Sequence, residues 1–225
     1  AGDLDVLLEG KKMGFSDTFI AKLWNMKEIE VYNLRKENKM FVVEGNKLVS
    51  ELLASDFKVE NILVTETWLE KFPEMAASLK SYEIVNAKQM EQMSSMVTPP
   101  GIIATAHTPS YNINPKDAEN EFILALDGIN DPGNLGTMIR TADWFGINKI
   151  VCSHDCADAW QAKTIQSTMG SIFRIQIIET DLRDFLLKTQ RHKDTKTQRQ
   201  RHKDTKTGDK DRGRFYVFAR LTADP

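Results

Sequence analysis

Short apolar runs alternate with helically spaced apolar positions along most of the chain, and this alternation predicts a mixed α/β protein. Apolar runs bounded by polar residues predict strands at 40–43, 59–64, 82–85 and 102–106, and again at 122–127, 148–152 and 174–178. Apolar residues three and four apart predict helices over 46–53, 68–79 and 90–96. Asn46 stands where its side chain can cap the first helix. The regular alternation of strands and helices in the second half implies a parallel sheet covered by helices.

Changes in composition divide the chain into segments. We expect a small α/β domain over 31–108 and a second, parallel-sheet domain over 121–187. A polar segment rich in proline, 109–120, is expected to link them. Residues 1–30 carry no functional pattern, and residues 188–225 form a tail that contains a basic repeat.

Charge is unevenly distributed along the 225 residues, whose formal net charge is −2. Residues 189–214 hold ten Lys or Arg against four Asp, a local charge of +6, so the remaining residues carry −8. A body with that charge repels phosphate groups. Any contact with nucleic acid therefore depends on local basic patches.

The cysteines and the lack of long apolar runs bear on location. Cys152 and Cys156 are the two cysteines of the sequence, which excludes a disulfide framework and suits a reducing cytoplasm. The sequence shows neither a run long enough to cross a membrane nor a signal-peptide pattern at its start, so we expect no membrane partner. The spacing Cys-Ser-His-Asp-Cys permits a zinc interpretation, but no fourth ligand is evident, and a buried Cys152 at a strand end is favoured.

The segment 127–142 carries the strongest signal of function. It follows a buried strand that ends at Leu126 and begins with a turn rich in Gly, Asn, Asp and Pro, residues that adopt unusual backbone angles. A helix then follows, with apolar positions at Leu135, Ile139, Ala142 and Phe145. A rigid polar loop at the carboxyl end of a strand is the usual place for a ligand in an open α/β sheet.

This segment resembles the first motif of the SpoU-type RNA methyltransferases, a branch of the SPOUT superfamily. The motif residues present here are Asp127, Asp131, Pro132, Asn134, Gly136, Arg140 and Ala142. The resemblance implies a SPOUT-type fold with a trefoil knot, S-adenosylmethionine as cofactor, transfer of a methyl group to a ribose 2′-hydroxyl of tRNA or rRNA, and a homodimer. It also implies catalytic roles for Asn134 and Arg140. A generic strand–turn–helix of another α/β protein is the alternative.

The first half of the chain resembles the ribosomal-protein-like RNA-binding domain that often precedes the SpoU domain. Two short motifs carry this likeness: Phe41, Val43, Glu44 and Gly45, and then Thr98, Pro99, Gly101, Ile102 and Ala104. By this resemblance Arg35, Lys36 and Glu44 are candidate RNA-binding residues. A structural role for Glu44 at the end of its strand is equally open.

The resemblance weakens toward the C-terminus. In the second family motif, Gln166 replaces the usual Arg and Thr168 the usual Ser, beside Gly170. The third motif, an Asn-Glu-Gly followed by Ser-Leu-Asn, whose loops form most of the cofactor pocket in the family, does not occur, so the cofactor residues stay unassigned. Instead the string Arg-His-Lys-Asp-Thr-Lys-Thr stands at 191–197 and again at 201–207. This repeat is either a basic arm for RNA, a solvated charge run, or a departure from the natural gene.

The candidate site residues each have a structural alternative. Arg140 fits anchoring of a phosphate better than proton removal, because arginine stays protonated; the alternative is an ion pair with Asp131 or Asp143. Asn134 can position a ribose, or it can cap the helix.

Two further functions therefore remain beside the methyltransferase. The chain could be a non-catalytic RNA-binding protein that keeps the scaffold without the cofactor pocket. It could also be an unrelated nucleotide-binding α/β protein.

Overall fold

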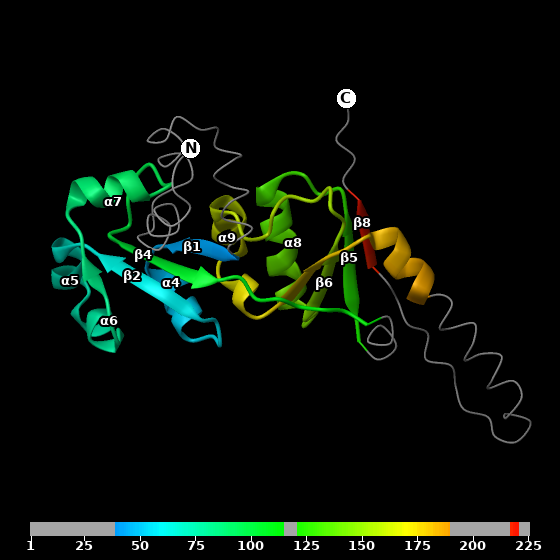
Figure 1. Cartoon of the computed structure of the whole chain (residues 1–225), viewed down its shortest axis with the longest axis horizontal. Coiled ribbons are helices and arrows are strands. Elements are labelled where there is room, and N and C mark those ends of the chain that lie inside the picture. Colours follow the sequence, from blue (N-terminus) through cyan, green and yellow to red (C-terminus); the bar gives the residue numbers. More distant parts are fainter. Residues whose placement is uncertain (1–38, 115–120, 190–216, 221–225) are drawn as a thin grey trace, which may run out of the picture.

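The computed structural model describes residues 39–114, 121–189 and 217–220. These residues form two α/β units that lie side by side along the long axis of the molecule (Figure 1). The first unit comprises residues 39–107, and the second begins at residue 121. The mixed α/β class and the parallel sheet of the second unit, both predicted from the sequence, are confirmed.

The first unit is built on a mixed sheet with the strand order β1-β4-β2-β3. Its strands are β1 (Met40–Glu44), β2 (Val59–Val64), β3 (Glu83–Ile84) and β4 (Ile102–His107). Strand β4 pairs antiparallel with both β1 and β2, whereas β3 pairs parallel with β2. The pairing Met40 with His107 extends β4 to His107, whose Nε2 lies 2.8 Å from Glu60 Oε2. The polar link between the units therefore starts after this residue.

The helices of the first unit differ from the sequence prediction at three points, one of which is that the helix expected over 90–96 spans Ala87–Met93. These helices are α4 (Asn46–Leu53), α5 (Glu66–Lys71), α6 (Pro73–Ser78) and α7 (Ala87–Met93). The single helix expected over 68–79 was wrong, because Pro73 lacks an N–H and forces Phe72 out of helical angles, to φ −128° and ψ 57°. The cap expected from Asn46 was also wrong, since Gly45 is the N-cap and Asn46 Oδ1 instead accepts a hydrogen bond from Trp68 Nε1 at 2.6 Å.

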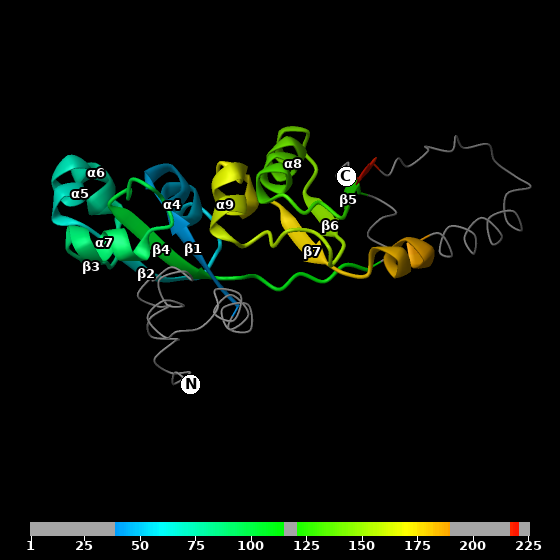
Figure 2. The same cartoon turned by 90° about the horizontal axis from the view of Figure 1, so that it is seen from above.

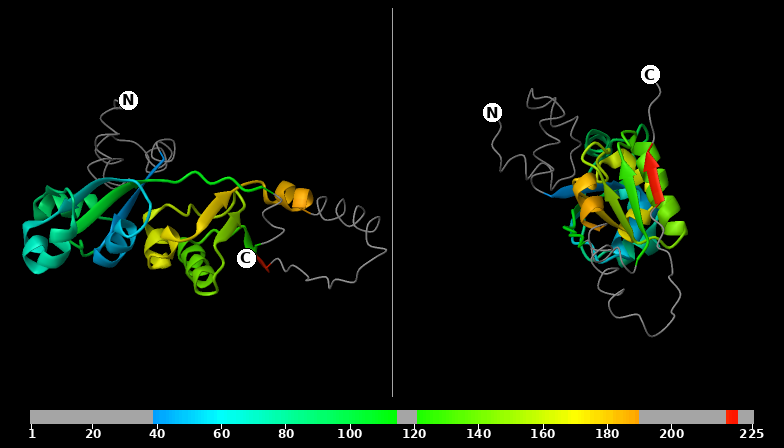
Figure 3. Two further views of the ribbon diagram at one scale, coloured as in Figure 1. Left: turned by 90° about the horizontal axis from the view of Figure 1, so that it is seen from below. Right: turned by 90° about the vertical axis from the view of Figure 1, so that its right-hand side faces the viewer.

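The second unit is built on a parallel sheet with the strand order β7-β6-β5-β8. Its strands are β5 (Ile123–Asp127), β6 (Lys149–Cys152), β7 (Gln176–Glu179) and β8 (Val217–Arg220). Strand β8 lies beside β5 at the edge of the sheet (Figure 3, right). Residues 217–220 belong to the predicted tail 188–225, yet they form a strand of this sheet. The expected knot depends on the chain between 190 and 216, which lies outside the described residues.

Alternate residues of β5 and β6 cover opposite faces of this sheet. The helices α8 (Pro132–Trp144) and α9 (Ala162–Thr168) lie together on one face (Figure 2). Leu124 and Leu126 belong to the core on this face, with Leu135 and Ile139 of α8. Neighbouring positions point the other way, and Ile123, Ala125 and Val151 pack with Leu182 and Phe185 of the helical residues 182–189.

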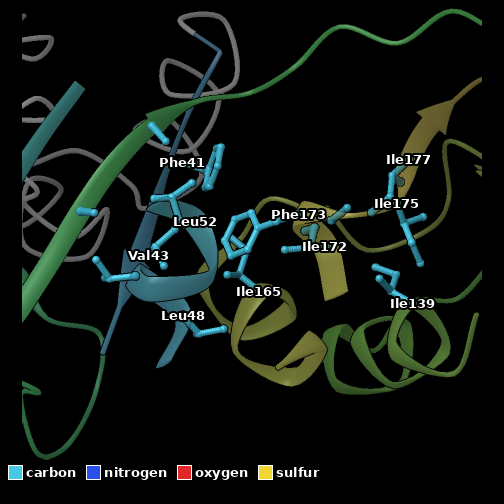
Figure 4. Packing of buried hydrophobic residues seen from close by; sticks show 14 of the residues in the cluster. Phe41, Val43, Leu48, Leu52, Ile139, Ile165, Ile172, Phe173, Ile175 and Ile177 are labelled. Atoms are coloured by element: carbon cyan, nitrogen blue, oxygen red, sulfur yellow. The ribbon is translucent and has the colours of Figure 1, made fainter. Parts of the chain in front are cut away.

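The cores of the two units are continuous. Phe41 of β1 packs against Trp160 and Phe173 of the second unit, with ring centroids 4.9 and 6.4 Å apart. Figure 4 shows Phe41 and Phe173 at this junction. Nearby, Gly170 has φ +100° and lies so close to α4 that a Cβ there would be 2.8 Å from Glu51 Cγ. Aromatic packing and this close approach fix how the units face each other. Within the described ranges, no helix is long and apolar enough to span a membrane.

Candidate functional site

The loop between β5 and α8 converts the strongest sequence motif into a rigid helix start. Gly128 follows the strand in the left-handed region, with φ +64°. Asp131 is the N-cap of α8, and its Oδ1 accepts a hydrogen bond from the backbone N–H of Asn134 at 2.7 Å. Pro132 occupies the first helical position, where a missing N–H costs nothing. Asp131 and Pro132 therefore fix the start of α8.

The same loop is held from its other side by the loop that follows β6. The N–H of Gly128 donates to Ser153 Oγ at 3.0 Å, and the N–H of Ile129 donates to Cys156 Sγ at 3.4 Å. Ala157 N–H donates to the Ile129 carbonyl at 2.8 Å. These bonds hold the backbone of Gly128 and Ile129 within the protein. No local pattern in the sequence indicates that Ser153 and Cys156 take this part.

Gly136 lets α8 pack unusually close to α9. A Cβ at this position would lie 2.5 Å from Ser167 Cβ and 2.7 Å from the Thr164 carbonyl oxygen. Both distances are below any that real side chains tolerate, so the glycine of the motif is required by helix packing.

Asn134 and Arg140 present exposed side chains on α8. Their spacing of six residues separates them by about 9 Å along the axis and roughly a third of a turn around it. With the residues that the structure describes, neither side chain forms a hydrogen bond or an ion pair. The structural alternatives are therefore not realised: Asp131 rather than Asn134 caps the helix, and Arg140 pairs with neither Asp131 nor Asp143.

Asp143 is bound by an arginine from another segment. Arg174 donates from Nε and Nη2 to Asp143 Oδ2 at 3.0 and 2.7 Å, and from Nη1 to Glu51 of the first unit. Burial alone would raise the pKa of Asp143, but hydrogen bonds from Arg174 and Ser171 outweigh it and lower that pKa. The hydrogen bonds that Arg174 donates to the Asp143 carboxylate likewise raise the pKa of Arg174. No local pattern in the sequence indicates this bridge.

The two cysteines lie behind the loop as free thiols. Cys156 Sγ donates to the Leu126 carbonyl at 3.4 Å, and a hydrogen bond with Cys152 lowers the pKa of Cys156 to about 6 against the opposing effect of burial. His154 Nδ1 lies 3.0 Å from Glu179 Oε1. Among the described residues, no three His, Cys, Asp or Glu side chains are grouped to hold a metal.

Of the predicted RNA-binding residues of the first unit, the structure describes Glu44. Arg35 and Lys36 lie outside the described residues. Glu44 is buried, and its carboxylate accepts hydrogen bonds from Ser94 Oγ, Ser95 Oγ and the Ser95 N–H. These contacts support a structural role for Glu44, because both oxygens of its carboxylate already accept hydrogen bonds within the protein.

The second motif lies at the junction of the units. Thr168 is fully buried and its Oγ1 donates to the Ile165 carbonyl at 2.7 Å, which closes the end of α9. Gly170 then makes the close approach to Glu51. Gln166 is half-buried on α9. The small residues of this motif therefore serve packing between the units.

Comparison with known families agrees with this geometry. Residues 121–218 match the SpoU rRNA methylase family, and residues 22–104 match an MRM3-like substrate binding domain. Residues 2–39, which apart from Lys39 lie outside the described part, match the oligomerisation domain of the carbamoyl-phosphate synthetase large chain. The match of 121–218 extends beyond residue 187, where the motif resemblance fades.

Individual relatives carry related names. The chain is 31% identical over 166 residues to the 23S rRNA (guanosine(2553)-2'-O)-methyltransferase of Bacillus subtilis, covering 73% of this chain and 64% of that protein. It is 29% identical to the human mitochondrial rRNA methyltransferase 3, covering 64% of this chain and 36% of the relative. The AdoMet-bound rRNA methyltransferase structure from Sinorhizobium meliloti matches with a TM-score of 0.58 and 29% identity, covering 71% and 61% of the two chains.

The fold, the β5–α8 loop and the family match together define the class of protein. Residues 121–218 form a domain of the SpoU rRNA methylase family. The whole chain spans 64% of the length of the Bacillus relative and 36% of the length of the human one, which is less than two thirds in both cases.

Proposed function

We propose that this protein transfers a methyl group from S-adenosylmethionine to a ribose 2′-hydroxyl of rRNA or tRNA. The observation that carries the proposal is the start of α8. There the family motif leaves the Asn134 amide exposed, and further along the same helix the Arg140 guanidinium, with no partner for either among the described residues. The names of the Bacillus and human relatives, both rRNA methyltransferases, support the choice of substrate class.

Arg140 and Asn134 would act by orienting the substrate. A ribose hydroxyl is a weak nucleophile, so its alignment with the methyl donor is a large part of catalysis. A guanidinium binds phosphate oxygens through two parallel hydrogen bonds and keeps its proton at neutral pH. An amide donates and accepts at once, which suits it to hold a sugar hydroxyl. We therefore assign phosphate anchoring to Arg140 and ribose positioning to Asn134.

The methyl donor supplies an activated methyl group when bound. The AdoMet-bound Sinorhizobium structure supports this cofactor. The described loops after β5 and β6 form hydrogen bonds with each other, and we assign no cofactor-binding residue within them. The residues at 190–216, where the family's third motif is expected, lie outside the described part. The residues proposed here act on the RNA side of the reaction.

We propose further that the protein works as a homodimer in the cytoplasm. The side chains of Trp144 and Phe145, at the end of α8, are 86% and 73% exposed, which is a large apolar surface for a single chain to leave in water. The free thiols of Cys152 and Cys156 suit a reducing compartment. Light scattering coupled to size-exclusion chromatography tests the dimer, and a monomer at micromolar concentration would contradict it.

The test of the activity compares matched arginine variants. Purified protein is incubated with radiolabelled S-adenosylmethionine and, separately, with unmodified rRNA and tRNA. We expect Arg140→Gln to lower kcat/KM about 100-fold, as does loss of a donor that stabilises a transition state. Arg183→Gln removes an equally exposed arginine from the helical residues on the far face of the sheet, and it is expected to change little. Equal activity of both variants would contradict the role of Arg140, and an inactive wild type would contradict the function.

A non-catalytic RNA-binding protein is the second candidate, because the sequence contains no Asn-Glu-Gly or Ser-Leu-Asn string of the third motif. Calorimetric titration with S-adenosylhomocysteine separates the two functions. Micromolar binding supports the enzyme, whereas no heat at millimolar ligand together with retained RNA binding supports the second candidate.

A further inference from the structure

Arg174 joins the two units and helix α8 through one guanidinium. Two of its nitrogens bind Asp143 of α8, and the third binds Glu51 of α4. Its own backbone position, directly after the 3-10 helix Ser171–Phe173, is fixed by buried neighbours. The guanidinium therefore determines where the Asp143 carboxylate points.

Asp143 follows Arg140 by three residues on the same helix. Residues three apart on a helix are surface neighbours, and a carboxylate and a guanidinium at this spacing attract each other. In the structure Asp143 is nevertheless bound to Arg174, and Arg140 has no ion pair with any described residue. The two arginines thus compete for one carboxylate, and Arg174 holds it.

We propose that Arg174 is a positioning residue, which keeps the Arg140 guanidinium free for RNA by holding Asp143 away from it. The proposal rests on the RNA-binding role of Arg140 given above. Because Arg174 also binds Glu51, the free state of Arg140 is coupled to the correct placement of the first unit, which matches a substrate binding domain. Arg140 is available when the two units are docked.

Loss of Arg174 has two expected effects on RNA binding. The released Asp143 pairs for part of the time with Arg140, and its uncompensated charge repels the RNA phosphates. A helical pair at this spacing is weak and solvent-exposed, so capture is partial. We expect Arg174→Gln to weaken RNA affinity and kcat/KM by roughly three- to tenfold.

The decisive experiment is a rescue with two matched double variants. Arg174→Gln combined with Asp143→Asn removes the carboxylate next to Arg140 and is expected to restore affinity and kcat/KM to within about twofold of wild type. Arg174→Gln combined with Glu51→Gln has the same net charge, but the carboxylate it removes belongs to the first unit. It is expected to remain as weak as the single variant.

Two outcomes would overturn the proposal. If both double variants recover equally, net charge explains the effect rather than the position of Asp143. If neither recovers, Arg174 serves only to hold the units together. Urea unfolding of all variants is measured in parallel. If Arg174 has only a structural role, activity should fall and recover together with stability. Our proposal instead predicts that Arg174→Gln combined with Asp143→Asn recovers activity although the bridge stays broken.

A measurement without RNA separates failure of this proposal from failure of the proposed function. Carbon-13 NMR follows titration of the Asp143 carboxyl in Arg174→Gln, with and without Arg140→Gln. We expect the second change to raise the pKa of Asp143 in the Arg174→Gln background and to leave it unchanged in the wild-type background. No response in either background would refute the competition, whatever the protein does to RNA. An inactive wild type with the expected response would refute the function alone.

Discussion

The two units start a helix after a strand in the same way, yet they use the polar residues at that point differently. In the first unit, β1 ends at Glu44, and Gly45 with φ +93° leads into α4. In the second, β5 ends at Asp127, and Gly128 with φ +64° begins the loop to α8. Each turn thus combines an acidic strand end with a glycine in the left-handed region.

The first turn directs its polar side chains into the protein. The Glu44 carboxylate accepts hydrogen bonds from Ser94 and Ser95, and Asn46 accepts one from the buried Trp68. In the second turn the side chain of Asp131 and the loop after β6 bond to the backbone of Asn134, Gly128 and Ile129, and Asn134 and Arg140 on the following helix are exposed. A turn whose backbone is held independently can leave its side chains for a ligand. This difference distinguishes a structural turn from a candidate site in the same chain.

Glu44→Ala should give the largest loss of stability. It removes a buried carboxylate and leaves the donors of Ser94 and Ser95 without a partner, which we expect to lower the free energy of unfolding by about 3 kcal/mol. Urea unfolding measures this loss. Glu44→Gln keeps an acceptor and is expected to lose about half as much. A full-stability Glu44→Ala variant with impaired RNA binding would reverse our assignment and make the first turn a binding site.

Gly136→Ala should give the next largest loss of stability. This variant tests whether helix packing holds the second turn in place. The new Cβ would overlap Ser167 and the Thr164 carbonyl, so α8 and α9 must separate. Such overpacking costs about 2 kcal/mol. Thr137→Ala changes the exposed neighbouring position and is expected to stay within about 0.5 kcal/mol. Equal stabilities of the two variants would show that the close helix contact is not required.

A pair of asparagine variants compares the turns directly. Asn46→Ala leaves the indole N–H of Trp68 without its acceptor, and we expect a loss of about 1.5 kcal/mol. Asn134→Ala removes no hydrogen bond to a described side chain and is expected to cost less than about 0.5 kcal/mol while lowering methyl transfer. Thermal unfolding and the methylation assay together check both. A larger loss of stability in Asn134→Ala than in Asn46→Ala would contradict the distinction between the two turns.

The smallest expected effect on stability is the loss of the ion pair between Arg174 and Asp143 in acid. Because the pKa of Asp143 is lowered in the folded protein, its contribution is fully present above the ordinary value of 3.8 and is lost as the pH falls through the lower folded value. For an exposed ion pair we expect less than about 1 kcal/mol. Wild type should therefore exceed Asp143→Asn in stability at neutral pH, and the gap should close in strong acid. A gap that widens with acid would contradict the lowered pKa.

Much of the fold could be predicted because short apolar runs mark buried strands. The strand predicted over 40–43 is β1, which extends one residue further, and that predicted over 148–152 is β6. Pro73 also marks the break between α5 and α6 in the sequence, although the spacing of apolar residues alone predicts one helix there. By contrast, residues 217–220 become a strand through pairing with β5, a partner that no local pattern identifies.

The site could be predicted only as far as local sequence determines it. The motif placed Asn134 and Arg140 on one helix after a strand, and they lie there with exposed side chains. Their roles in catalysis stay predictions. Ser153, Cys156 and Arg174 come from other segments, and their contacts with the loop and with α8 depend on tertiary packing. Asp143, one of the two alternative partners considered for Arg140, is bound by Arg174 for the same reason.

The parallel pairing of β8 with β5 also has a consequence for biosynthesis. The first unit is complete by His107 and can fold while the ribosome is still making the rest, whereas β5 waits for residues 217–220 before its second edge is covered. Until then an apolar strand edge is open to other nascent chains. Premature termination ahead of Val217 should therefore yield an aggregating product with an intact first unit.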